Sequence, residues 1–115
     1  MLRMMIELER RDGVDIVKFS INRINALVSE EIKGSITKIL DKSNIRLIID
    51  LGSVEYIDSS GFGCLLSLMR TARDNYSQMK IVCSQQSVMT LFETLHLQTI
   101  FEIFSDLDDC ISSFK

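Results

Sequence analysis

Hydrophobic positions near the start of the chain recur at the spacing of β-strands. Residues 4–9 and 14–21 alternate loosely between apolar and polar side chains, and residues 10–13 between them end in an Asp-Gly pair that favours a tight turn. The two segments are therefore predicted to form an antiparallel hairpin. Residues 47–49 form a continuous apolar run, which is typical of a strand covered on both faces. We expect this run to lie at the centre of the sheet.

A helical spacing follows the hairpin. Residues 22–25 are expected to carry the chain out of the sheet before this helix begins. Ser29 precedes Glu30 and Glu31, a pattern that marks a helix start with acids in its first turn. One apolar stripe then recurs at helical intervals and consists of Ile32, Ile36, Ile39 and Leu40.

The second half of the chain continues the alternation of helix and strand. A helix is predicted from residue 58 to about residue 72 or 73, followed by a strand over residues 79–83. A further helix is predicted from a cap at Ser84 to about Leu95, followed by a short strand over residues 101–104. Ser105 and two aspartates that follow it open a terminal helix. The apolar residues that share one face of this helix are Leu107, Ile111 and Phe114.

Strands that alternate with helices in this order predict an α/β fold. We expect a mixed β-sheet of about five strands, with parallel crossovers and one hairpin edge, packed with about four helices. The 115 residues are enough for one buried core and too few for two, so residues 1–115 are expected to form a single domain.

Composition and charge argue against several classes of function. A net charge of −3 without a basic stripe makes nucleic-acid binding a poor interpretation. The N-terminal segment reaches Glu7 before a long apolar stretch develops, and no run approaches the roughly 18–20 residues that span a membrane. We therefore expect a cytoplasmic chain without membrane insertion. Cys64, Cys83 and Cys110 lie far apart and are predicted to be small buried hydrophobes rather than disulfide partners or zinc ligands.

The corner at residues 58–63, Asp-Ser-Ser-Gly-Phe-Gly, leads from the central strand into the second helix and is the strongest local signal. Asp58 or Ser59 is the predicted N-cap, because a short side-chain oxygen can accept from the free N–H groups of the first turn. A phosphate here would meet backbone donors and the positive end of the helix dipole. Gly61 and Gly63 each cost the helix about 1 kcal/mol relative to Ala, which suggests tight packing or the close approach of another molecule.

The helix after the corner carries more apolar residues than one buried stripe requires. They are Phe62, Leu65, Leu66, Leu68, Met69 and Ala72. Either a partner or a loop of this chain covers the excess, and the sequence leaves both interpretations open.

The motifs that would indicate an enzyme are missing. An active site brings together an acid, a base and a nucleophile, whereas this chain has one histidine, His96, interpreted as a surface or capping residue. A serine-hydrolase elbow needs glycine two positions before the serine, where Ile57 and Asp58 stand instead. Residues 61–63 lack the third glycine of a dinucleotide loop. The aspartates show no metal-ligand spacing, so no catalytic residue, cofactor or metal is predicted.

Residues 47–51, followed by residues 54–63, resemble the signature of STAS domains, whose founding members are bacterial anti-sigma-factor antagonists. The resemblance covers nearly the whole chain, from residues 25–27 at the approach to the first helix to residues 101–104 near the end. The Asp-Ser-Ser-Gly-Phe-Gly core is specific at this strand-to-helix corner. The resemblance therefore implies the STAS fold for residues 1–115.

The resemblance also implies a mechanism. In the antagonists, the serine directly after the aspartate is phosphorylated by the partner, an anti-sigma factor that is itself an ATP-dependent serine kinase, and the matching residue here is Ser59. The unmodified form captures the anti-sigma factor and frees the sigma factor, the phosphorylated form does not bind, and a PP2C-type phosphatase resets it. The expected partner-binding residues are Asn25, Asp58, Ser59, Ser60, Gly61, Phe62, Gly63 and Leu66.

Two other hypotheses follow from the same residues. STAS domains also serve as subunits of lipid-transport complexes or stressosome-like scaffolds, and the apolar excess at Phe62 and Leu66 favours such a role here. The corner serine would then be a packing or capping residue. An independent hydrolase would rest only on Asp58, Ser59 and His96.

Overall fold

The structure, a computed structural model, describes residues 5–114 and is built on a five-stranded sheet. The strand order is β1-β2-β4-β6-β7, formed by β1 (Ile6–Arg11), β2 (Val14–Phe19), β4 (Arg46–Asp50), β6 (Gln78–Val82) and β7 (Ile103–Phe104). The pair β1 and β2 is antiparallel and every other pair is parallel. The predicted mixed sheet with one hairpin edge is therefore confirmed. Met4, the predicted start of the first strand, lies outside the described residues.

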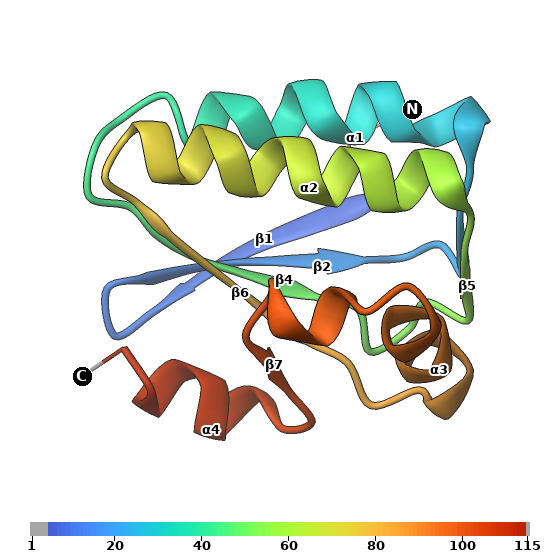
Figure 1. Cartoon of the computed structure of the whole chain (residues 1–115). Coiled ribbons are helices and arrows are strands. Elements are labelled where there is room, and N and C mark those ends of the chain that lie inside the picture. Colours follow the sequence, from blue (N-terminus) through green and yellow to red (C-terminus); the bar gives the residue numbers. More distant parts are fainter. Residues whose placement is uncertain (1–4, 115) are drawn as a thin grey trace.

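Helices cover both faces of this sheet, as Figure 1 shows. The helices α1 (Ala26–Ile39) and α2 (Ser59–Asp74) run side by side over one face, and the short α4 (Leu107–Ser112) lies on the other. The helix α3 (Gln86–Thr94) packs against a 3-10 turn, η2 (Leu97–Thr99). The expected four α-helices are present.

The central strand is buried on both faces, as predicted. Leu47, Ile48 and Ile49 are each fully buried. Leu47 and Ile49 belong to the core under α1 and α2, whereas Ile48 belongs to the smaller core under α4. Burying a side chain of this size contributes about 1.5–3 kcal/mol, so β4 is held in place from both sides.

The hairpin turn is shorter than predicted. Only Asp12 and Gly13 form it, with φ angles of 53° and 78°. Two consecutive positive φ values match the right-handed twist of a hairpin and suit an Asp-Gly pair. The strands therefore extend to Arg11 on one side and begin at Val14 on the other.

Two predicted helix starts need correction. The first helix begins at Ala26, where Asn25 is the N-cap and accepts from the N–H of Leu27, because Asn25 offers a capping oxygen four residues before Ser29. No acid therefore lies in its first turn. The third helix follows Gln85 without a side-chain cap, and not Ser84. The terminal helix begins where it was predicted to, and Asp106 caps it by accepting from the N–H of Asp109.

A second sheet of two short strands was not predicted. The strand β3 (Arg23–Ile24) pairs in parallel with β5 (Tyr56–Ile57). Each of these strands directly precedes a long helix, β3 before α1 and β5 before α2. Their pairing therefore sets the N-termini of α1 and α2 next to each other at one end of the molecule (Figure 1).

Candidate functional site

Asp58 is the N-cap of α2 and connects the starts of the two long helices. Its carboxylate oxygen Oδ1 accepts from the N–H of Gly61 at 3.0 Å and from the hydroxyl of Ser60 at 2.6 Å. Its own N–H donates to the carbonyl of Ile24 at 3.1 Å, and the N–H of Ala26 at the start of α1 also stabilises its negative charge. Of the two predicted caps, the structure therefore selects Asp58.

These hydrogen bonds lower the pKa of Asp58 below its ordinary value of 3.8, with the Ser60 hydroxyl as the largest cause and the Gly61 N–H as the next. Because the folded pKa lies below the unfolded one, the charge stabilises the fold above about pH 4, and this contribution is lost as the pH falls through the folded pKa. We expect Asp58→Asn to melt below the native chain at neutral pH, with a gap that narrows below about pH 4. Thermal unfolding of both proteins across this range tests this, and a constant gap would contradict it.

The two serines of the corner differ in what their hydroxyls can do. Ser60 is half-buried and its hydroxyl is committed to Asp58. Ser59 is the first residue of α2, is exposed, and makes no side-chain hydrogen bond to another described residue. Of the two hydroxyls, the one on Ser59 is therefore exposed and has no hydrogen-bond partner among residues 5–114.

The two glycines of the corner are present for different reasons. A Cβ at Gly61 would lie 2.5 Å from the Cγ2 of Ile57 and 3.0 Å from the carbonyl oxygen of Ile24. Gly61 is thus required by the packing of α2 on β3 and β5. A Cβ at Gly63 would meet nothing within 4 Å, and Gly63 is exposed.

Phe62 does not lie on the surface where it was expected. It is 4% exposed, and its ring meets Phe92 of α3 edge to face, with centroids 5.1 Å apart. Phe92 in turn packs edge to face on Phe101. The expectation that Phe62 contacts a partner is therefore corrected, because α3 covers it. Leu66 is 36% exposed, so the apolar excess of α2 is covered by the chain at Phe62 and left open at Leu66.

Asn25, also expected at the partner surface, is half-buried, and its side chain is used as the cap of α1. It lies directly before Ala26, whose N–H stabilises the charge of Asp58. The structure thus brings Asn25 into the same corner as Asp58 and Ser59.

Comparison with known proteins decides the family. A sequence model of the STAS domain matches residues 5–110. The chain belongs to the STAS domain family. One STAS relative is the anti-sigma-B factor antagonist of Listeria monocytogenes, which is 29% identical over 102 residues, covering 89% of this chain and 90% of the relative.

Solved structures share the STAS fold of this chain. An anti-sigma factor antagonist from Mycobacterium paratuberculosis superposes with a TM-score of 0.84 at 22% identity, covering 94% of this chain and 91% of that one. The anti-sigma factor antagonist SpoIIAA, solved in its unphosphorylated form, superposes with a TM-score of 0.76 at 16% identity, covering 95% of each chain. At these identities the likeness establishes the fold.

A groove between α1 and α2 of this STAS domain was missed by sequence reasoning. Its volume is about 310 Å³, and residues of both helices line it, among them Ser29, Lys33, Ser60 and Gly63. Leu27, in the first turn of α1, is 87% exposed and was missed as well. The misplaced start of the first helix hid both features, because it put Ser29 at a cap instead of inside the helix.

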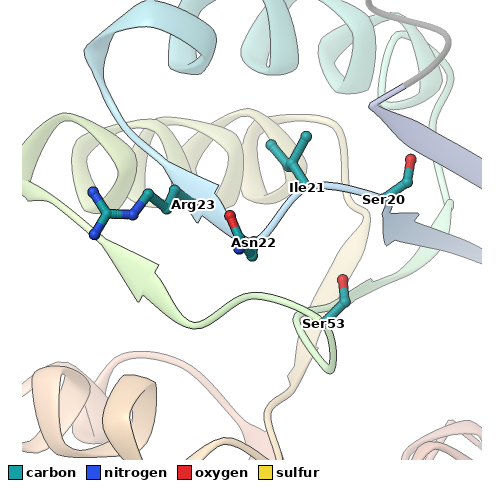
Figure 2. A pocket seen from close by; sticks show the side chains of 5 residues that line it. All are labelled: Ser20, Ile21, Asn22, Arg23 and Ser53. Carbon is teal, nitrogen blue, oxygen red and sulfur yellow. The ribbon is translucent and has the colours of Figure 1, made fainter.

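Another hollow, of about 580 Å³, is lined by Ser20, Ile21, Asn22, Arg23 and Ser53, around the start of β3 (Figure 2). Figure 2 shows Arg23 extending away from the other four, and its guanidinium stacks on the ring of Tyr56 at 5.5 Å. The hydroxyl of Ser53 donates to the carbonyl of Phe19. These polar groups therefore hold the loop before β3 in place, and the hollow does not include Ser59.

The remaining candidate ligands of the STAS domain do not converge. Cys64, Cys83 and Cys110 are free and buried, as predicted, and burial raises the pKa of the Cys64 thiol to about 11. Among residues 5–114, no three His, Cys, Asp or Glu side chains gather as a metal site would require. His96 is exposed after α3. None of the helices in this part of the chain combines the length and the apolar character needed to cross a membrane.

Proposed function

We propose that this STAS domain is an anti-sigma-factor antagonist whose binding is switched by phosphorylation of Ser59. The observation that carries the proposal is the open hydroxyl of Ser59 at the first residue of α2, beside an aspartate that is already engaged. The relatives described as anti-sigma factor antagonists support the class of partner. The unphosphorylated domain binds an anti-sigma factor that is itself a serine kinase, and the sigma factor is released.

The proposed switch is electrostatic. A phosphate adds about −1.5 to −2 charges at neutral pH, and at Ser59 it would lie next to the Asp58 carboxylate on a surface that docking must desolvate. The N–H groups and dipole of the 16-residue helix α2 tolerate this anion in the folded domain. Phosphorylation should therefore block docking without unfolding the domain, and a PP2C-type phosphatase would restore binding.

Exposed apolar side chains around the corner support docking of a protein. Leu27, Tyr56 and Leu66 are 87%, 43% and 36% exposed, and they belong to α1, β5 and α2, the three elements that meet near Ser59. Apolar and aromatic side chains are the common anchors of protein interfaces. These residues replace Phe62 in the proposed partner surface.

The alternative functions gain less support from the structure than the proposed one. The scaffold hypothesis depended on an apolar excess at Phe62 and Leu66, of which only Leu66 remains exposed because Phe62 belongs to the core. The hydrolase hypothesis needs a histidine hydrogen-bonded to the serine, whereas the Ser59 hydroxyl makes no hydrogen bond to another residue in 5–114. The carboxylate of Asp58 is engaged by Ser60 and by backbone N–H groups. We propose a non-enzymatic role in the cytoplasm, where a sigma factor and an ATP-dependent kinase act.

Phosphorylation by the anti-sigma factor kinase of the source organism tests this function. With ATP, the native chain should gain one phosphate by intact-protein mass spectrometry, and Ser59→Ala should gain none while it still binds the kinase. Ser60→Ala is the matched control and should still be modified, because the Ser60 hydroxyl donates to Asp58 and is not the acceptor of the phosphate. A mass shift that persists in Ser59→Ala would rule out this site.

A further inference from the structure

Gly63 weakens α2, although packing against the other residues in 5–114 does not require a glycine there. Ser59 and Gly63 are four residues apart and therefore lie on the same face of the helix. Glycine is the least favourable residue in a helix interior apart from proline. A Cβ at Gly63 would meet no atom within 4 Å, in contrast to Gly61, where Ile57 and Ile24 leave no space. Packing therefore does not require glycine at this position, and unlike Gly34, for which the same holds, Gly63 lines the groove between α1 and α2.

Ser29 of α1 lines the same groove and is the second observation. It is 6% exposed, yet its hydroxyl makes no hydrogen bond to another described residue. Buried hydroxyls nearly always have a partner. Within residues 5–114, every side-chain nitrogen or oxygen that is fully shielded from solvent has a hydrogen-bond partner. Because the Ser29 hydroxyl has none, its oxygen is not fully shielded, and it faces the open space of the groove. It is available there for a group that enters from outside.

We propose that the groove between α1 and α2 receives one polar side chain of the docked anti-sigma factor, with the Ser29 hydroxyl as its hydrogen-bond partner. This inference rests on the proposed function. A protein that reaches Ser59 must also cover Gly63, because both lie on one face of α2 and Ser60 lines the groove. Because Gly63 has no side chain, the groove stays open at this position. The groove is also lined by one negatively charged residue, Glu30, and one positively charged residue, Lys33.

Filling the groove tests the proposal, with Gly63→Leu as the variant and Gly34→Leu as its matched control. Gly34 is an exposed glycine of α1 whose Cβ would also meet nothing within 4 Å. Both variants replace glycine by a strong helix former and should melt no lower than the native chain. By titration calorimetry with the anti-sigma factor kinase, Gly63→Leu should weaken binding about tenfold or more, whereas Gly34→Leu should not.

The outcomes separate this inference from the proposed function. If the native chain binds the kinase and Gly63→Leu binds equally well, the groove proposal is overturned and the function stands. If the native chain itself fails to bind, the proposed function falls, and the groove proposal with it. Should the free domain form dimers that Gly63→Leu dissociates, the occupant is a second copy of this chain and the proposal is wrong.

A second variant tests the hydrogen bond at the groove wall. Ser29→Ala removes a hydroxyl without an internal partner, so the melting temperature should not fall. Its affinity for the kinase should drop roughly fivefold. Ser35→Ala, on the same helix but not in the groove lining, is the control and should bind like the native chain. Equal binding by Ser29→Ala and Ser35→Ala would remove Ser29 from the proposed contact.

Discussion

Replacing Ser59 by aspartate should lower the affinity for the anti-sigma factor about thirtyfold or more and leave the fold intact. An unpaired charge in a desolvated interface costs about 2–5 kcal/mol, which corresponds to this loss. The new carboxylate would stand next to that of Asp58, so the partner would have to desolvate two adjacent negative groups. Within the domain the same charge lies at the first residue of α2, where the helix dipole favours it.

Ser59→Asn is the matched control, because asparagine has nearly the shape of aspartate without its charge. Titration calorimetry with the anti-sigma factor kinase should show a much smaller loss for Ser59→Asn than for Ser59→Asp, and thermal unfolding should show both variants folded. Equal losses for the two variants would mean that shape and not charge controls docking. Binding of Ser59→Asp as tight as that of the native chain would disprove the switch.

The corner at Asp58 could be predicted because its chemistry is local. An N-cap depends on a side-chain oxygen and a backbone N–H three residues later, and the Asp58 carboxylate accepts from Gly61 in this way. The buried strand before it was equally clear, since a continuous apolar run at residues 47–49 suits a strand covered on both faces. The position of Ser59 at a helix start followed from these two short patterns.

The groove and the second sheet could not be predicted because they depend on residues far apart in the sequence. Ile24 pairs with Ile57 in the second sheet. Because α1 starts directly after this pair, its N-cap is Asn25 and not Ser29. Both side chains suit a cap, so the local pattern could not distinguish them. Phe62 was misplaced for the same reason, since Phe92, thirty residues later, covers it.

Gly61→Ala should destabilise the domain by roughly 2–3 kcal/mol, although alanine is the better helix former. The added methyl would lie 2.5 Å from the Cγ2 of Ile57 and 3.0 Å from the carbonyl oxygen of Ile24. The buried side chain of Ile57 has no free space to rotate into, and the carbonyl of Ile24 accepts a hydrogen bond from the N–H of Asp58. Neither neighbour can therefore move away easily. Relief of the clash must therefore push α2 away from β3 and β5.

Gly63→Ala, in the same helix, is the matched control and should stabilise the domain by about 0.5–1 kcal/mol, because its methyl meets nothing within 4 Å. Urea unfolding of the isolated domain measures both changes. If both variants shift the midpoint in the same direction, internal packing does not distinguish the two glycines. Opposite shifts would mean that Gly61 holds the helix starts together and that packing inside the domain does not require Gly63.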